Sequence, residues 1–315
     1  MMDKGQQRNS SLIRRSKKGY AEAIIRMVLD SLDSPNSRRA YERALTDFLV
    51  WHEAQGRPQL NKATVQRYAT GLREAGLSSA NINQRLSAIR KLAREAADNG
   101  VLDSQLASGI TAVKGIKQEG RRTGNWLTRE QAQSLLEAPI TSTLKGRRDR
   151  ALLAVLIGCG LRRTEAAILN IGHIQQRDGR WVLVDLIGKG NKLRSVPMPG
   201  WAKAAIDVWT EKAGIVEGHV FRSMNRHGQI IGEQMTPQAI RNVVVEFAGR
   251  RGFDGIAPHD LRRTFAKLAH KGGAGVDQIQ LSLGHASMQT TEAYLGVEQD
   301  LTDAPCDHLG LRLKT

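Results

Sequence analysis

The sequence is poor in cysteine and has no long apolar run. Only two cysteines, Cys159 and Cys306, occur among 315 residues. Neither belongs to a CxxC pair or a Cys/His cluster, so we expect no structural metal site and no disulfide framework. No run approaches the roughly 18 apolar residues of a membrane-spanning helix, and the basic amino terminus lacks the apolar segment of a secretory signal. These absences predict a cytoplasmic protein without a membrane partner.

Acidic and aromatic residues are also scarce. The chain has 47 Lys and Arg against 31 Asp and Glu, a net charge of +16, and aromatic residues make up only 4% of it. Such a surplus predicts a polyanionic partner, with nucleic acid ahead of an anionic membrane surface. Few aromatic rings argue against base stacking as the main mode of binding. We therefore expect contacts to a nucleic-acid backbone.

Apolar periodicity and glycine-rich breaks divide the chain into five segments. Residues 1–30 form a polar, basic amino-terminal segment that we expect to be frayed at its start. Residues 31–113 have helical spacing and predict a small helical bundle. Residues 114–125 contain three glycines without periodicity, as is typical of a linker. Residues 126–298 predict helices with a few strands, and 299–315 form a short tail.

The segment 126–298 carries distinct local signals. Thr128 and Gln131 stand at the spacing of a capping box. Val182, Val184 and Leu186 alternate before the turn GKGNK, and with a preceding turn they predict a three-stranded antiparallel sheet. Further helices are predicted at 200–213, 237–250, 259–271 and 275–283, with a short last one around Tyr294. The expected fold is mainly helical with a small antiparallel sheet.

Cations follow the outer face of the third predicted helix of the bundle. Arg85, Arg90, Lys91 and Arg94 lie largely off its apolar stripe. This pattern fits a solvated face and fits equally a face laid against DNA phosphates.

Two helix starts carry cations where the helix dipole already favours anions. Arg162 precedes a helix that Thr164 could cap, and backbone N–H groups there could bind an anion. His259 and Arg262 lie three residues apart in the first turn of another helix. Each feature alone is also typical of an ordinary surface arginine or structural histidine.

Four short motifs occur in order along the carboxy-terminal part: CGLRRTE, GKGNKLRSVP, PHDLRRTFA and LGHASMQTTEAY. Together they resemble the boxes of the tyrosine recombinase (phage integrase) family, and the helical bundle resembles its SAM-like core-binding domain. The resemblance covers nearly the whole chain. It implies the two-domain type without an arm-binding domain, with the catalytic domain at 126–298.

The resemblance implies a site that cuts DNA by attack of a tyrosine on a phosphodiester, with no metal ion or cofactor. Its residues would be Arg162, Lys189, His259, Arg262, His285 and Tyr294. Tyr294 holds the position of the nucleophile, His259 that of its base, and Lys189 that of the acid for the departing 5′ oxygen. Planar, permanently charged guanidinium groups suit the non-bridging oxygens, and His285 holds a phosphate-bonding position.

Some positions are ambiguous or depart from the family pattern. Glu165 matches an acidic position that orients other groups, but it fits equally a helix-start carboxylate favoured by the dipole. Arg263 stands where many members have a second histidine, and Arg163 where a small or apolar residue is common. Ala166 and Ala167 are slimmer than the usual helix start, so local packing is expected to differ.

The implied function is site-specific DNA recombination through a 3′-phosphotyrosine and a Holliday junction, in DNA integration or excision. The implied partners are double-stranded DNA core sites and three further copies of the chain in a homotetramer. A type IB topoisomerase and a non-catalytic DNA-binding protein are the alternatives. The leucines of the tail 299–315 either fold back on their own domain or dock on a neighbouring protomer.

Overall fold

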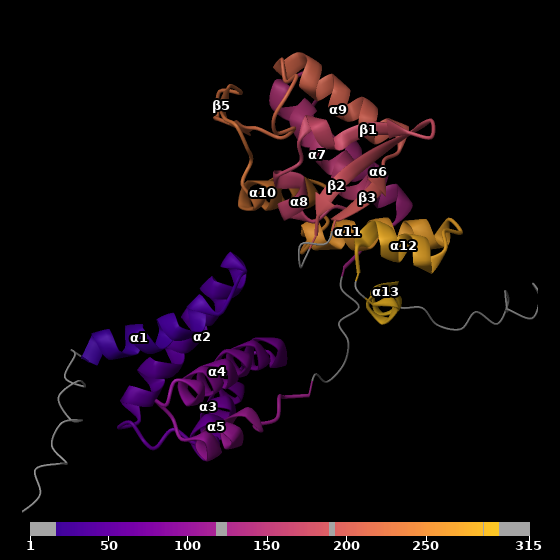
Figure 1. Cartoon of the computed structure of the whole chain (residues 1–315). Coiled ribbons are helices and arrows are strands. Elements are labelled where there is room, and N and C mark those ends of the chain that lie inside the picture. Colours follow the sequence, from indigo (N-terminus) through magenta and orange to yellow (C-terminus); the bar gives the residue numbers. More distant parts are fainter. Residues whose placement is uncertain (1–16, 118–124, 189–192, 286, 296–315) are drawn as a thin grey trace, which may run out of the picture. The chain divides into compact units, whose positions relative to one another are not determined.

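The computed structural model describes residues 17–117, 125–188, 193–285 and 287–295 (Figure 1). The chain forms two compact units, Met1–Arg121 and Arg122–Thr315. None of the helices in the described residues is long and apolar enough to cross a membrane. The predicted fold class is confirmed: both units are mainly helical, and the second contains a small antiparallel sheet.

The amino-terminal unit is a helical bundle in its described residues. Its helices are α1 (Lys17–Asp30), α2 (Pro35–Ala54), α3 (Lys62–Glu74), α4 (Ser79–Asp98) and α5 (Ser104–Thr111). A polar side chain accepts a backbone N–H at the start of each of the last four, which satisfies groups that the helix leaves unpaired. These caps are Ser34, Asn61, Ser78 and Asp103.

Helix α1 differs from the sequence prediction, which placed no regular element before residue 31. Val28 is fully buried, and Ile24 and Ile25 pack against the core of the unit. Three apolar residues on one helical face outweigh the basic residues that precede them. Val28 joins a core built mainly from α2, α3, α4 and α5, with Phe48 and Leu86 among its fully buried side chains.

The cations along α4 mostly make contacts within their own unit. Arg85 bonds Asp47 at 2.7 Å and Arg90 bonds the carbonyl of Val113 at 3.1 Å. Lys91 pairs with Glu95 at 2.9 Å. Arg94 is exposed. Arg85 and Arg90 therefore tie α4 to other segments, and Lys91 forms a pair within the helix, roles that neither reading of the sequence pattern included.

The carboxy-terminal unit surrounds the buried helix α7. Its helices are α6 (Arg129–Glu137), α7 (Leu144–Gly158), α8 (Arg163–Ala167), α9 (Gly200–Ala213), α10 (Pro237–Arg250), α11 (Pro258–Lys271), α12 (Val276–Leu283) and α13 (Met288–Leu295). A 3₁₀ turn, η1 (Ile171–His173), precedes the sheet. Residues 151–157 of α7 are all buried, so this helix forms the centre of the core.

The main sheet has the predicted antiparallel order β1 (Ile174–Arg177), β2 (Arg180–Ile187), β3 (Leu193–Pro197). Of the residues predicted to alternate along β2, Val184 and Leu186 are buried, but Leu183 is buried as well and interrupts the alternation. The register shifts between Leu183 and Leu186, and Asp185 has a φ of +55°. This is a β-bulge, which redirects the side chains that follow it. A second hairpin, β4 (Ser223–Met224) with β5 (Ile230–Gly232), was not predicted.

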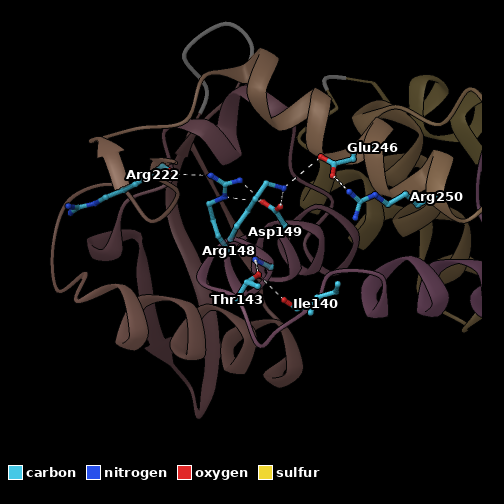
Figure 2. A network of polar contacts seen from close by, with 9 residues as sticks. Ile140, Thr143, Arg148, Asp149, Arg222, Glu246 and Arg250 are labelled. Atoms are coloured by element: carbon cyan, nitrogen blue, oxygen red, sulfur yellow. Dashed lines mark hydrogen bonds and ion pairs between the residues drawn. The ribbon is translucent and has the colours of Figure 1, made fainter. Parts of the chain in front are cut away.

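An ionic network with a buried centre, Arg148 and Asp149, joins the start of α7 to α10 (Figure 2). The Arg148 guanidinium donates twice to Asp149, at 2.9 and 2.7 Å, and once to the carbonyl of Arg222. Lys145 lies between Asp149 at 2.8 Å and Glu246 of α10 at 3.7 Å. Because α10 packs against α8, this network stabilises the framework on which the first motif is mounted.

Candidate active site

Glu165, in the short helix α8, makes contacts to arginines from two other elements. Its Oε1 accepts from Arg162 Nη1 at 2.7 Å and from Arg194 Nη1 at 2.8 Å. Its Oε2 accepts from Arg194 Nη2 at 2.8 Å and lies 4.0 Å from Arg262 Nη1. We call Arg162, Glu165, Arg194 and Arg262 the Glu165 cluster. It joins α8, β3 and α11 in one site.

The start of α8 differs from the expected capping by Thr164. Arg162 is the N-cap residue, and its backbone N–H donates to Glu165 Oε2 at 2.8 Å. A glutamate three residues after the cap can reach back to the free backbone N–H of the cap residue. Thr164 does not cap the helix and is exposed. Glu165 therefore fills both roles left open by the sequence: it stabilises the helix start and it orients the arginine side chains.

The Glu165 carboxyl is ionised across the whole working pH range. Burial alone would raise its pKa, but hydrogen bonds from Arg194 and from the Arg162 backbone outweigh burial and lower the pKa to about 2. The carboxylate offsets only part of the charge of three guanidinium groups. The Glu165 cluster therefore keeps a positive surplus.

The two predicted arginines differ in accessibility. The side chain of Arg262 is 1% exposed and that of Arg162 is 28% exposed. Arg262 donates to the carbonyl of Gly160 at 2.6 Å and to that of Leu283. It thereby ties α11 to the turn before α8 and to the end of α12. Arg162 presents the more accessible cation.

Both predicted histidines belong to the same electrostatic environment. His259 is an exposed residue at the start of α11. Partial burial of its ring, together with the charges of Arg263 and Arg262, lowers its pKa. Burial and the charges of Arg262 and Arg162 lower the pKa of His285 to about 4. Both imidazoles are consequently neutral near pH 7, so each can accept a proton or donate a hydrogen bond.

His285 is tied to the last described helix. Its Nδ1 lies 3.0 Å from Oγ1 of Thr291, whose side chain is fully buried. A threonine hydroxyl that donates to Nδ1 leaves the proton of the neutral ring on Nε2. Thr291 lies on α13 three residues before Tyr294, so the same helix holds the orientation of His285 and carries the expected nucleophile.

The predicted site residues thus fall into two groups. The structure brings Arg162, Arg262, His259 and His285 together. Lys189 lies outside the described residues, as does the tail, and for Tyr294 only its place on α13 is described.

Sequence reasoning missed the roles of Arg194 and Thr291. Both stand inside the second and fourth motifs, so a signal was present in the sequence, but spacing alone did not reveal their contacts. Within the described ranges, no group of three or more His, Cys, Asp or Glu side chains could hold a metal ion.

The lowered pKa values predict sensitivity to acid. A histidine whose folded pKa is below its ordinary 6.5 binds protons better when unfolded, so its contribution to stability is lost as the pH falls from 6.5 towards 4. Glu165 adds a second loss between pH 4.5 and 2. The free energy of unfolding, measured with denaturant at a series of pH values, should fall less between pH 6.5 and 4 in His285→Gln than in the wild type. The exposed His227 provides the control His227→Gln, and equal pH dependence in all three proteins would contradict this assignment.

Comparison with known proteins gives consistent matches. Residues 125–300 match the phage integrase family, and residues 29–100 match the phage integrase N-terminal SAM-like domain. Tyrosine recombinase XerC of Xanthomonas campestris pv. campestris (strain B100) is 30% identical over 266 residues, covering 83% of this chain and 78% of that protein. The XerC of Pseudomonas savastanoi pv. phaseolicola is 28% identical over 268 residues, covering 83% and 85%.

Solved structures show the same fold at lower identity. The XerH site-specific recombinase bound to palindromic difH substrate aligns with a TM-score of 0.66 at 21% identity, covering 84% of this chain and 77% of that one. A lambda integrase dimer bound to a COC′ core site also gives a TM-score of 0.66, at 17% identity, covering 90% and 79%.

Proposed function

The chain belongs to the phage integrase family and is a site-specific DNA recombinase, and we propose that it acts through a 3′-phosphotyrosine at Tyr294 and a Holliday junction. The observation that carries the mechanism is the Glu165 cluster, which gathers three guanidinium groups beside two neutral histidines. The family match favours recombination over the alternatives of a type IB topoisomerase and a non-catalytic DNA-binding protein.

The proposed role of the arginines follows from the charge of the transition state. As the tyrosine oxygen attacks, negative charge gathers on the non-bridging oxygens of the phosphate. Preorganised cations that stabilise this charge lower the barrier without moving during the reaction. Arg162 is accessible to such a phosphate, and Arg262 contributes its positive charge from a buried position.

The histidines have complementary proposed roles. His259 is neutral near pH 7 and exposed, so it can accept the proton of the tyrosine hydroxyl. His285, with its Nδ1 held by Thr291, can donate from Nε2 to a phosphate oxygen. Lys189 supplies the proton to the departing 5′ oxygen.

Cleavage is expected to continue in excess EDTA. The arginines of the Glu165 cluster supply the positive charge that Mg²⁺ supplies in many nucleases. Strand cleavage should stay within about twofold when the chelator is added, because no step needs a Lewis acid. Loss of cleavage that returns on adding Mg²⁺ would contradict this mechanism.

The proposed assembly is a homotetramer on two double-stranded core sites, with both units of each protomer contacting its DNA. The net charge of +16 supports extensive phosphate contacts. The related XerH structure contains palindromic difH substrate, and the related lambda integrase structure contains a COC′ core site. We assign the tail 299–315 to docking on the neighbouring protomer. We propose the cytoplasm, where the DNA lies, as the place of action.

The function is tested by strand exchange on a defined duplex. Wild-type protein first enriches its own binding sequence from a random DNA library, and that sequence defines the site duplex. Two labelled site duplexes incubated with protein and no ATP should exchange strands and give a Holliday junction. Relaxation of plasmids regardless of the site would instead indicate a topoisomerase, and binding without any cleavage would indicate a non-catalytic protein.

A further inference from the structure

Arg194 of strand β3 links the Glu165 cluster to the segment that carries His285. We propose that Arg194 is a positioning residue for strand cleavage: it fixes the Arg162 guanidinium through Glu165 and does not itself touch DNA. This inference rests on the proposed cleavage reaction and assigns a residue to it that the sequence reasoning did not.

The first line of support is the way Arg194 shares the carboxylate. Arg194 and Arg162 both donate to Oε1 of Glu165, while Oε2 receives Arg194 Nη2 and the Arg162 backbone N–H. Every hydrogen bond described for this carboxylate therefore comes from these two arginines. With Arg194 removed, each carboxylate oxygen keeps one of these hydrogen bonds, and both of those come from Arg162 itself. The Arg162 side chain would then be paired with a carboxylate that β3 no longer holds in place.

The second line of support is the contact of Arg194 with the turn before His285. Its Nε donates to the carbonyl of Ser282 at 3.0 Å, at the end of α12. Gly284 has a φ of +59°, and a Cβ there would lie 2.8 Å from Cδ of Arg194. The arginine stem therefore packs directly against the backbone that leads into His285. One side chain thus contacts both halves of the proposed phosphate site.

The burial and geometry of Arg194 fit positioning better than direct binding. Its side chain is only 8% exposed, whereas that of Arg162 is 28% exposed. All three types of donor on its guanidinium, Nε, Nη1 and Nη2, are engaged by protein oxygens. A planar fork can make this set of contacts, but the ammonium of lysine cannot.

The test compares two scissile groups in the site duplex. One is the ordinary phosphodiester, and the other is a methylphosphonate, in which a neutral methyl group replaces one non-bridging oxygen. Because the methylphosphonate develops less negative charge, its cleavage depends less on where Arg162 lies. Arg194→Lys keeps the charge and loses the fork. Since a displacement of about 1 Å can cost roughly 10²-fold in rate, we expect a loss of that order on the phosphodiester and a much smaller loss on the methylphosphonate.

A matched control is available in the same unit. Arg148 is also buried and makes a two-fold contact with a carboxylate, that of Asp149, but in the network at the start of α7 (Figure 2). Arg148→Lys should either lower the cleavage rates of the phosphodiester and the methylphosphonate by the same factor or leave both unchanged. Affinity for the site duplex should be unchanged in Arg194→Lys, because the proposal gives Arg194 no DNA contact.

The outcomes separate this proposal from the proposed function. Equal losses for Arg194→Lys on both substrates would show a purely structural role and overturn the proposal, as would weakened DNA binding. Wild-type protein that fails to cleave the phosphodiester would instead contradict the recombinase mechanism. Rates are measured at a temperature where circular dichroism shows each variant folded. If Arg194→Lys does not fold, Gly284→Ala displaces the same side chain with no change in charge, and the same substrate difference is required of it.

Discussion

Tyr294→Phe is expected to bind the site duplex like the wild type and to form no covalent DNA adduct. The substitution removes a single oxygen, which is the atom proposed to form the bond to phosphorus. Tyr294 lies on α13 one turn after Thr291, which holds His285 beside the Glu165 cluster. A nicked suicide duplex, from which the cut fragment diffuses away, should trap the wild-type adduct on a denaturing gel.

The control for this prediction is another tyrosine. Tyr68 is buried in the amino-terminal unit, and its hydroxyl contacts Arg85. Tyr68→Phe should retain the adduct because that hydroxyl lies in the core of the helical bundle and has no proposed part in cleavage. An adduct formed by Tyr294→Phe at the wild-type rate would remove Tyr294 from the mechanism.

Lys189→Ala is expected to slow cleavage of ordinary DNA by about 10²- to 10⁴-fold, the usual contribution of a general acid. The departing 5′ oxygen needs a proton, whereas a sulfur placed at the same bridging position leaves as a stable thiolate. A duplex with this 5′-bridging sulfur should therefore be cut by Lys189→Ala at nearly the wild-type rate. The measurement is single-turnover cleavage of both duplexes.

Lys192, in the same motif, supplies the matched control. Lys192→Ala removes an equal charge from the same motif. Its cleavage rate relative to the wild type should be the same on the oxygen and the sulfur duplex. If Lys189→Ala is slowed equally on oxygen and sulfur substrates, its role is phosphate binding and the leaving group is protonated by another residue.

Elements with strong local signals could be predicted from the sequence. Helix α10 begins at Pro237 after the Thr236 cap, and α6 begins after the capping box of Thr128 and Gln131, both as predicted. Caps and prolines act over three or four residues, so the information is contained in the local sequence. The resemblance to the recombinase boxes is likewise confirmed by the family match.

Features that depend on distant contacts could not be predicted in this way. Arg194 and Glu165 are separated by 29 residues, and only the folded chain shows that the two terminal nitrogens of Arg194 donate to the two oxygens of the Glu165 carboxylate. The bulge at Asp185 depends on how β2 pairs with β3, which the alternation pattern does not encode. Helix α1 was missed because its apolar side chains find their partners on α2 and α4.

The central claim is that Tyr294 bonds directly to the DNA 3′ phosphate. The most direct measurement is nuclease and protease digestion of the trapped wild-type adduct, followed by mass spectrometry of the peptide that carries the nucleotide. The account predicts a nucleotide joined through its 3′ phosphate to Tyr294 in the peptide that follows His285. A nucleotide on any other residue, or one joined through its 5′ phosphate, would contradict it.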